Sequence, residues 1–131
     1  MSTVQRFEDL EIWQEARRLS KEIIVISNTT ELNKDFKLKA QLKNSSGYVM
    51  DNIAEGFERN GNGEFRQFLS IAKGSAGEAR SQLYRVFDNN YISEEKLTLL
   101  IREYEKLGIK IHNFITYLNK KDFKGTKFRD S

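Results

Sequence analysis

Hydrophobic positions recur along the chain at alternating spacings of three and four residues, in four separate stretches. The most regular stretch predicts a helix over residues 93–119, because such a row forms one packing face of a helix. Its face consists of Leu97, Leu100, Tyr104, Leu107, Ile111, Phe114 and Leu118. Ser93 is the expected N-cap, and Glu94 and Glu95 follow in the first turn, where the helix dipole favours acids.

Three further stretches predict helices over about residues 8–28, 36–56 and 63–88. The second has the face Leu38, Leu42, Ser45, Val49, Asn52 and Gly56, and the third has Phe65, Leu69, Ala72, Ala76, Ala79, Leu83 and Val86. The first helix is less regular, with Leu10, Trp13, Ile23 and Ile24 on one side and Ile12, Leu19 and Ile26 beside them. Since this apolar arc is too wide for one packing face, we expect it to meet both the bundle and a second surface.

Short polar connections at residues 28–33, 57–62 and 89–92 join the predicted helices. Helices about 30–40 Å long with connections this short pack beside their neighbours in opposite directions. The expected fold class is therefore all-α, an antiparallel up-down-up-down four-helix bundle. The bundle spans residues 1–119, and residues 120–131 form a basic C-terminal tail.

The composition excludes several classes of protein. The 131 residues contain no Cys and no Pro, with one Trp and one His. Without Cys there is no disulfide framework, zinc–thiolate site or thiol nucleophile. No apolar run is long enough to span a bilayer, and the first residues lack the apolar stretch of a secretion signal. We expect a cytoplasmic protein without membrane contact.

No arrangement typical of catalysis or metal binding is present in the sequence. A di-metal bundle requires Glu-x-x-His pairs, but Ile109 stands three residues before the single His112, which is interpreted as a surface residue. The glycine-containing stretches lack the Walker spacing, and no nucleophile–base pair is visible. We expect no enzyme activity, metal or cofactor. The alternative is an enzymatic site around Asn52, Glu55 and Glu78, but the absence of metal-ligand and nucleophile–base patterns argues against it.

The net charge of +3 is concentrated at the C-terminus. Residues 120–131 hold five Lys or Arg and two Asp, so residues 1–119 sum to zero. The basic character therefore belongs first to the tail and does not by itself mark the folded body as binding nucleic acid.

A row of cations with a seven-residue spacing runs from the start of the third helix along its length. The row consists of Arg59, Arg66, Lys73 and Arg80; of these, Arg66, Lys73 and Arg80 form a basic ridge beside the apolar face, and Tyr84 continues it. Seven residues are nearly two helical turns, so the side chains share one side of the helix. Three interpretations are open: a solvated flank paired with acids such as Glu64 and Glu78, a stripe that follows a nucleic-acid backbone, or a ridge matched by acids on another subunit.

Two groups of residues indicate close helix packing. Gly74, Ser75, Ala76, Gly77 and Ala79 favour a neighbouring helix at short distance, with Trp13 or Tyr48 opposite, since helical glycine costs about 1 kcal/mol relative to alanine. In the second group, Asn52 lies on the packing face, Glu55 stands beside it and Gly56 ends the helix as a C-terminal cap. We expect this polar cluster, with Gln41, Ser45, Arg59 or Ser75 as partners, to fix helix register.

The same residues carry a family resemblance. Gln41-Leu42, Asn52-Ile53-Ala54-Glu55-Gly56, Arg59, Glu64-Phe65, Phe68-Leu69, Ile71-Ala72, Gly74-Ser75 and Glu78 resemble the four-helix bundle proteins encoded in ribosomal-RNA intervening sequences. The opening residues 7–16 are similar to the start of that family. The resemblance implies a ring-shaped homopentamer. It also implies distant kinship with the accessory variability determinant proteins of diversity-generating retroelements, which bind nucleic acid and a reverse transcriptase.

The sequence thus predicts a non-enzymatic homo-oligomer that binds RNA or DNA through phosphates. The expected contacts are Arg59, Arg66, Lys73, Arg80, Tyr84, Lys120, Lys121, Lys124, Lys127 and Arg129. The structural motif consists of Gln41, Asn52, Glu55, Gly56, Gly74, Ser75 and Glu78. The alternative is a protein–protein scaffold or accessory subunit that does not itself bind nucleic acid.

Overall fold

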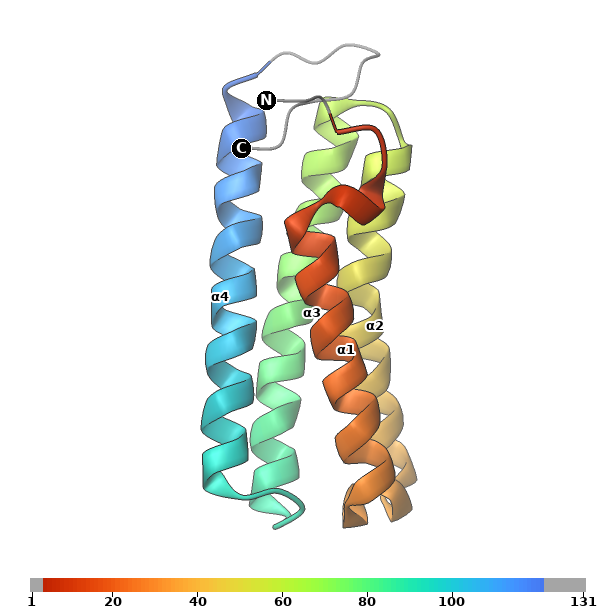
Figure 1. Ribbon diagram of the computed structural model, residues 1–131, viewed down its shortest axis with the longest axis vertical. Coiled ribbons are helices and arrows are strands. Elements are labelled where there is room, and N and C mark those ends of the chain that lie inside the picture. The colour runs from red at the N-terminus through yellow and green to blue at the C-terminus, as the bar shows by residue number, and fades with distance from the viewer. Residues whose placement is uncertain (1–3, 122–131) are drawn as a thin grey trace.

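Four long helices pack side by side in the computed structural model, which describes residues 4–121 (Figure 1). They are α1 (Glu11–Thr29), α2 (Phe36–Glu58), α3 (Asn62–Asp88) and α4 (Glu94–Asn119), and the short 3-10 helices η1 (Phe7–Asp9) and η2 (Glu31–Lys34) flank α1. In Figure 1 the chain descends through α1, rises through α2, descends through α3 and rises through α4. No β-strand occurs in residues 4–121, so the all-α prediction is confirmed.

The helices end within a few residues of the predicted positions, and two differences have a local cause. Residues 7–9 form η1, so α1 begins only at Glu11. The predicted cap at Gly56 is wrong, because α2 continues to Glu58 and the turn follows at Asn60, whose φ is 59°. Asparagine tolerates this left-handed conformation better than most residues.

Side-chain hydrogen bonds cap the first turns of two helices at the connections. Ser93 accepts a hydrogen bond from the Lys96 amide, as predicted, and Asp35 does the same for Leu38 at the start of α2. Asp35 also accepts a hydrogen bond from the Tyr91 hydroxyl at 3.0 Å, which ties the α3–α4 connection to α2 and raises the pKa of Tyr91. These contacts keep the two turns at that end of the bundle together.

The predicted packing faces of α3 and α4 are buried along their whole length. In α1 the prediction is correct only in part: Leu10 and Ile23 are buried, but Ile24 on the same predicted side is 42% exposed. The residues predicted to flank this side are buried as well, namely Ile12, Leu19 and Ile26. Val25, like Ile24, is exposed. The expectation that the apolar arc of α1 is wider than one packing face is therefore correct.

The predicted close approach of a helix at Gly74 and Gly77 is wrong within the chain, since a Cβ on either glycine would meet nothing within 4 Å. Trp13 packs on Phe7 instead, and Tyr48 is 53% exposed. The close approach occurs at Gly56, where a Cβ would lie 2.6 Å from the Cβ of Phe68 and 2.9 Å from the Phe65 ring. Gly56 therefore permits α2 and α3 to touch.

Hydrogen bonds between helices fix their relative heights along the bundle. The buried Ser45 hydroxyl donates to Gln82 Oε1 at 2.5 Å, and Arg85 donates to Gln41 at 3.0 Å. Along the bundle axis, residue numbers therefore increase in α2 in the direction in which they decrease in α3. Arg80 meets Glu105 at 3.2 Å and Arg66 meets Asn119 at 2.6 Å, which sets the heights of α3 and α4 in the same way.

The contact between α1 and α4 is rich in charge. Arg18 pairs with Glu103 at 2.6 Å, Lys110 with Glu11 at 2.7 Å, and Lys96 with Glu22 at 3.5 Å. The Glu15 and Glu103 carboxylates raise the pKa of Arg18. No helix in the part of the chain that the structure describes is apolar and long enough to cross a membrane.

The two kinds of glycine predict opposite effects of substitution. Gly56→Ala should lower the free energy of unfolding by about 1–3 kcal/mol, because the new methyl group overpacks the α2–α3 contact. Gly74→Ala should raise it by up to about 1 kcal/mol, because an exposed helix interior favours alanine. Urea denaturation followed by circular dichroism measures both, and equal effects of the two substitutions would contradict this account of the packing.

Candidate functional site

Three of the four cations in the seven-residue row, Arg66, Lys73 and Arg80, lie on the side of α3 that faces α4, whereas Arg59 follows the last residue of α2 and lies beside the contact between α2 and α3. Most of the four have partners within the chain. Arg59 pairs with Glu55 at 2.8 Å and Glu64 at 3.6 Å, and its guanidinium lies over the Phe68 ring. The hydrogen bond with Glu55 raises the pKa of Arg59. The acid Glu64 was expected as a partner on this flank.

Further along the ridge the partners come from α4. Arg66 donates to Asn119, and Arg80 pairs with Glu105 rather than with Glu78. Lys73 is exposed and makes no hydrogen bond or ion pair within residues 4–121. Tyr84 is exposed on the same helix, as the interpretation as a stacking residue requires. Carboxylates of the same chain therefore neutralise Arg59 and Arg80, whereas Lys73 has no partner within residues 4–121.

A groove of about 570 Å³ lies on the surface between α3 and α4, beside the ridge. Gly77 on α3 and Gly108 on α4 both line it, and neither would meet an atom within 4 Å if it carried a Cβ. The remaining lining residues are Lys73, Ala76, Arg80, Tyr104, Glu105, Ile109 and His112. The groove thus combines apolar lining residues with the Arg80–Glu105 ion pair, His112 and Lys73, which has no partner within residues 4–121.

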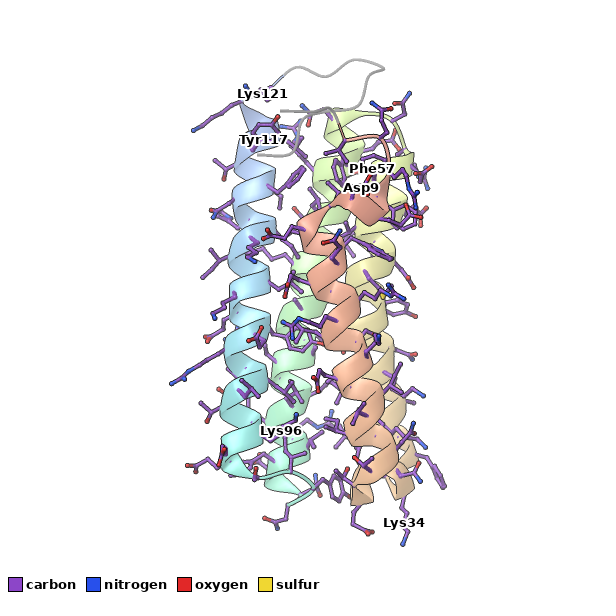
Figure 2. All side chains as sticks on the ribbon, in the orientation of Figure 1. Asp9, Lys34, Phe57, Lys96, Tyr117 and Lys121 are labelled. Carbon is purple, nitrogen blue, oxygen red and sulfur yellow. The ribbon has the colours of Figure 1, made fainter. Side chains whose placement is uncertain are left out.

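Two side chains at the start of α3 hold the end of α4. Asn62 Nδ2 donates to the carbonyl oxygens of Leu118 at 2.9 Å and Lys121 at 2.7 Å, and Arg66 bonds to Asn119. Lys121 Nζ also lies 5.6 Å from the centre of the Tyr117 ring. Figure 2 shows Lys121 and Tyr117 together at one end of the bundle, with Lys34 at the other. Arg66 and the exposed Lys120 and Lys121 therefore share one end.

The remaining predicted contacts, Lys124, Lys127 and Arg129, lie outside the described residues. The structure thus brings together the first two lysines of the tail and the upper part of the ridge, which the sequence presented as separate segments. Sequence reasoning missed Asn62, which makes this connection. The only signal was its place in an Asn-Gly-rich turn, which is typical of many turns without such a role.

The structural motif is less buried than predicted. Asn52 is half-buried and donates to the Tyr48 carbonyl at 2.8 Å, and Glu55 is exposed. Gln41 accepts a hydrogen bond from Arg85, Ser75 is half-buried, and Gly74 and Glu78 are exposed. The polar pair that is buried between α2 and α3 consists of Ser45 and Gln82. The sequence did not indicate that Gln82 is the partner of Ser45. Asn52 and Glu55 are therefore surface residues of α2 rather than a buried cluster.

The described residues offer little for metal binding. Residues 4–121 contain no group of three His, Cys, Asp or Glu side chains placed to hold a metal ion. His112 is exposed at the edge of the groove, as expected of a surface residue. Tyr104 is buried, and its burial raises the pKa of its hydroxyl, so the side chain is neutral at physiological pH.

Comparison with known families decides the classification. The family model described as 23S rRNA-intervening sequence protein matches residues 8–113. The chain belongs to this family. The match confirms the resemblance drawn from the residues around Asn52–Gly56, whereas the suggested kinship with the retroelement proteins stays a prediction.

A solved structure supports the fold of this 23S rRNA-intervening sequence protein family member. It is a protein of unknown function from the S23 ribosomal protein family of Bacteroides thetaiotaomicron, with a TM-score of 0.74 and 18% sequence identity over 80% of this chain and 95% of that chain. At this identity the likeness concerns the fold. No curated protein matches the sequence.

The contacts of Asn62 predict a measurable effect on the end of α4. Asn62→Ala removes two hydrogen bonds and should lower the free energy of unfolding by about 1–2 kcal/mol. The amide hydrogens of Lys120 and Lys121 should exchange faster with solvent, as measured by hydrogen exchange. Asn44→Ala, at an exposed position of α2, is the matched control and should leave that exchange unchanged. Unaltered exchange in Asn62→Ala would show that Asn62 does not hold the helix end.

Proposed function

We propose that the protein is a non-enzymatic, cytoplasmic helical bundle that associates with further copies of itself and binds RNA or DNA through phosphates. In this proposal the antiparallel bundles form a ring, with five copies as the family resemblance implies. The proposal for nucleic acid depends on one observation: Asn62 and Arg66 hold residues 118–121 against α3, so that Arg66, Lys120 and Lys121 gather where the basic tail leaves the bundle.

Charge supports phosphate contacts at this end rather than sequence-specific recognition. Lys120 and Lys121 are exposed, and Arg66 bonds to the neutral Asn119 amide, so none of the three is neutralised by a carboxylate within residues 4–121. Contacts of lysine and arginine with phosphates release counterions and carry little sequence information. A ring would repeat this basic end in every copy and multiply its affinity for one nucleic-acid strand.

Self-association is supported independently by exposed apolar side chains. Ile24 and Val25 lie exposed on α1, and Tyr48, Ile71, Leu99 and Ile109 are more than 50% exposed on the other helices. The scaffold alternative uses the same surfaces and differs in making no contact with nucleic acid. Binding measurements on the assembled protein separate the two functions.

Binding to a labelled RNA hairpin and a DNA duplex tests the proposal. Fluorescence anisotropy at low salt should detect both, and the logarithm of the binding constant should fall linearly with the logarithm of the salt concentration. Lys120→Ala/Lys121→Ala/Lys124→Ala should weaken binding about tenfold or more and reduce that slope by about two to three, since each lost phosphate contact removes about one unit.

The matched control removes three lysines toward the opposite end of the bundle, one in η2 and two in the first half of α2. Lys34→Ala/Lys37→Ala/Lys43→Ala changes the net charge equally and should leave affinity within about twofold, because only general attraction is reduced. Equal losses in both triple variants would refute a localised site. Absence of binding by the unaltered protein at low salt would leave the scaffold function.

A further inference from the structure

We infer that the α3–α4 groove of one copy receives the outer face of α2 of the next copy, with Tyr48 seated between Gly77 and Gly108. The inference rests on the proposed self-association and specifies its contact surface. Three observations carry it: the shape of the groove, the exposed side chains of α2, and the heights that the hydrogen bonds impose on the helices.

The groove is open because both walls lack side chains at the same height. The pair Arg80–Glu105 on one side and Arg66–Asn119 on the other place Gly77 opposite Gly108. A Cβ at either position would have no neighbour within 4 Å, although a glycine within a helix costs about 1 kcal/mol relative to alanine. Nothing in the described part of the same chain fills the space of about 570 Å³.

The outer face of α2 carries a projecting aromatic side chain followed by acids. Tyr48 is 53% exposed, and Asp51, Glu55 and Glu58 follow on the same exposed side of the helix. Asp51 makes no hydrogen bond or ion pair within residues 4–121. The groove offers one opposite charge, because the exposed Lys73 lines it and has no hydrogen-bond or ion-pair partner among these residues, while its Arg80 and Glu105 pair with each other. Complementary charge favours this pairing.

The positions of Tyr48 and of the groove along the bundle axis agree with this pairing in a closed ring. Copies related by rotation about an axis parallel to the bundle are not shifted along it, so heights within one copy apply to its neighbour. The bonds Gln41–Arg85 and Ser45–Gln82 place Tyr48 level with residues 78–79 of α3, beside Gly77. By the same count Asp51 is level with residues 75–76 and Glu55 with residues 71–72. Lys73 of the neighbouring copy would therefore lie between the carboxylate of Asp51, which has no partner within residues 4–121, and that of Glu55, which already pairs with Arg59.

The contact is heterologous, since the two surfaces belong to different faces of the bundle. Such contacts repeat from copy to copy and close into a ring when the rotation permits. Arg80 is kept in place by Glu105, so it borders the groove without an unpaired charge. The basic end with Lys120 and Lys121 is not part of this contact and stays available for the proposed nucleic-acid binding.

Light scattering after size-exclusion chromatography tests the contact. Gly77→Leu/Gly108→Leu fills the groove at positions where a Cβ meets nothing within 4 Å in the monomer, so helices should persist by circular dichroism while the particle mass falls toward 15.3 kDa. Gly74→Leu is the matched control, because Gly74 also lacks neighbours but does not line the groove, and it should leave the mass unchanged. Tyr48→Ala should act like the groove-filling variant.

A charge exchange gives a second, independent test. Lys73→Glu alone and Asp51→Lys alone should each raise the protein concentration at which the assembly half-dissociates by about tenfold or more, because like charges then face each other. The combined variant Lys73→Glu/Asp51→Lys should restore most of the association.

The outcomes distinguish this inference from the function on which it rests. An assembled unaltered protein whose mass does not respond to the groove, tyrosine and charge variants would overturn the contact and leave self-association standing. A 15.3 kDa particle at every concentration of the unaltered protein would overturn both. Nucleic-acid binding by that monomer would still support the basic end.

Discussion

The packing of α2 directly on α3 sets the relative heights of the side chains on these two helices. Gly56 permits the contact, since any larger residue would collide with Phe68. The buried Ser45–Gln82 hydrogen bond then selects one register, because a shift by one helical turn would leave a buried polar group without its partner, at a cost of about 1–3 kcal/mol. The position of α4 follows from its own contacts with α3, which create the groove and the basic end. The height of Tyr48 on α2 relative to that groove depends on the α2–α3 register.

Regular patterns were predictable and irregular ones were not. The faces of α3 and α4 could be predicted because their apolar residues form a single narrow row. In α1 the consecutive residues 23–26 are all apolar, so the sequence does not determine which of them is buried. That choice is made by packing against the other helices, a tertiary effect absent from local spacing. Glycines pose the same problem, since Gly56 meets α3 whereas Gly74 and Gly77 face open space.

The seven-residue spacing correctly placed Arg66, Lys73 and Arg80 on one side of α3, but Arg59 lies at the end of α2 instead, and the spacing did not identify the partners on α4. Glu105 and Asn119 come from α4, far along the chain, and no local pattern links them to Arg80 and Arg66. These contacts do not remove the arginines from binding, because an exposed ion pair such as Arg80–Glu105 contributes only about 0–1 kcal/mol and the Asn119 amide does not neutralise the charge of Arg66. They do hold the guanidinium groups in place, which distinguishes them from the free Lys73.

The stability of the bundle and the charge on its surface have separate physical origins. The α1–α4 ion pairs are partly exposed, so each contributes little, and the attachment of α1 depends on buried residues such as Leu19, Ile23 and Ile26. Salt screens surface charges but leaves burial of apolar area intact. Moderate salt should therefore weaken the proposed contacts with phosphates and between copies long before it weakens the fold. If salt abolishes binding while the protein stays helical, the loss of binding therefore reflects screening of surface charges and not unfolding.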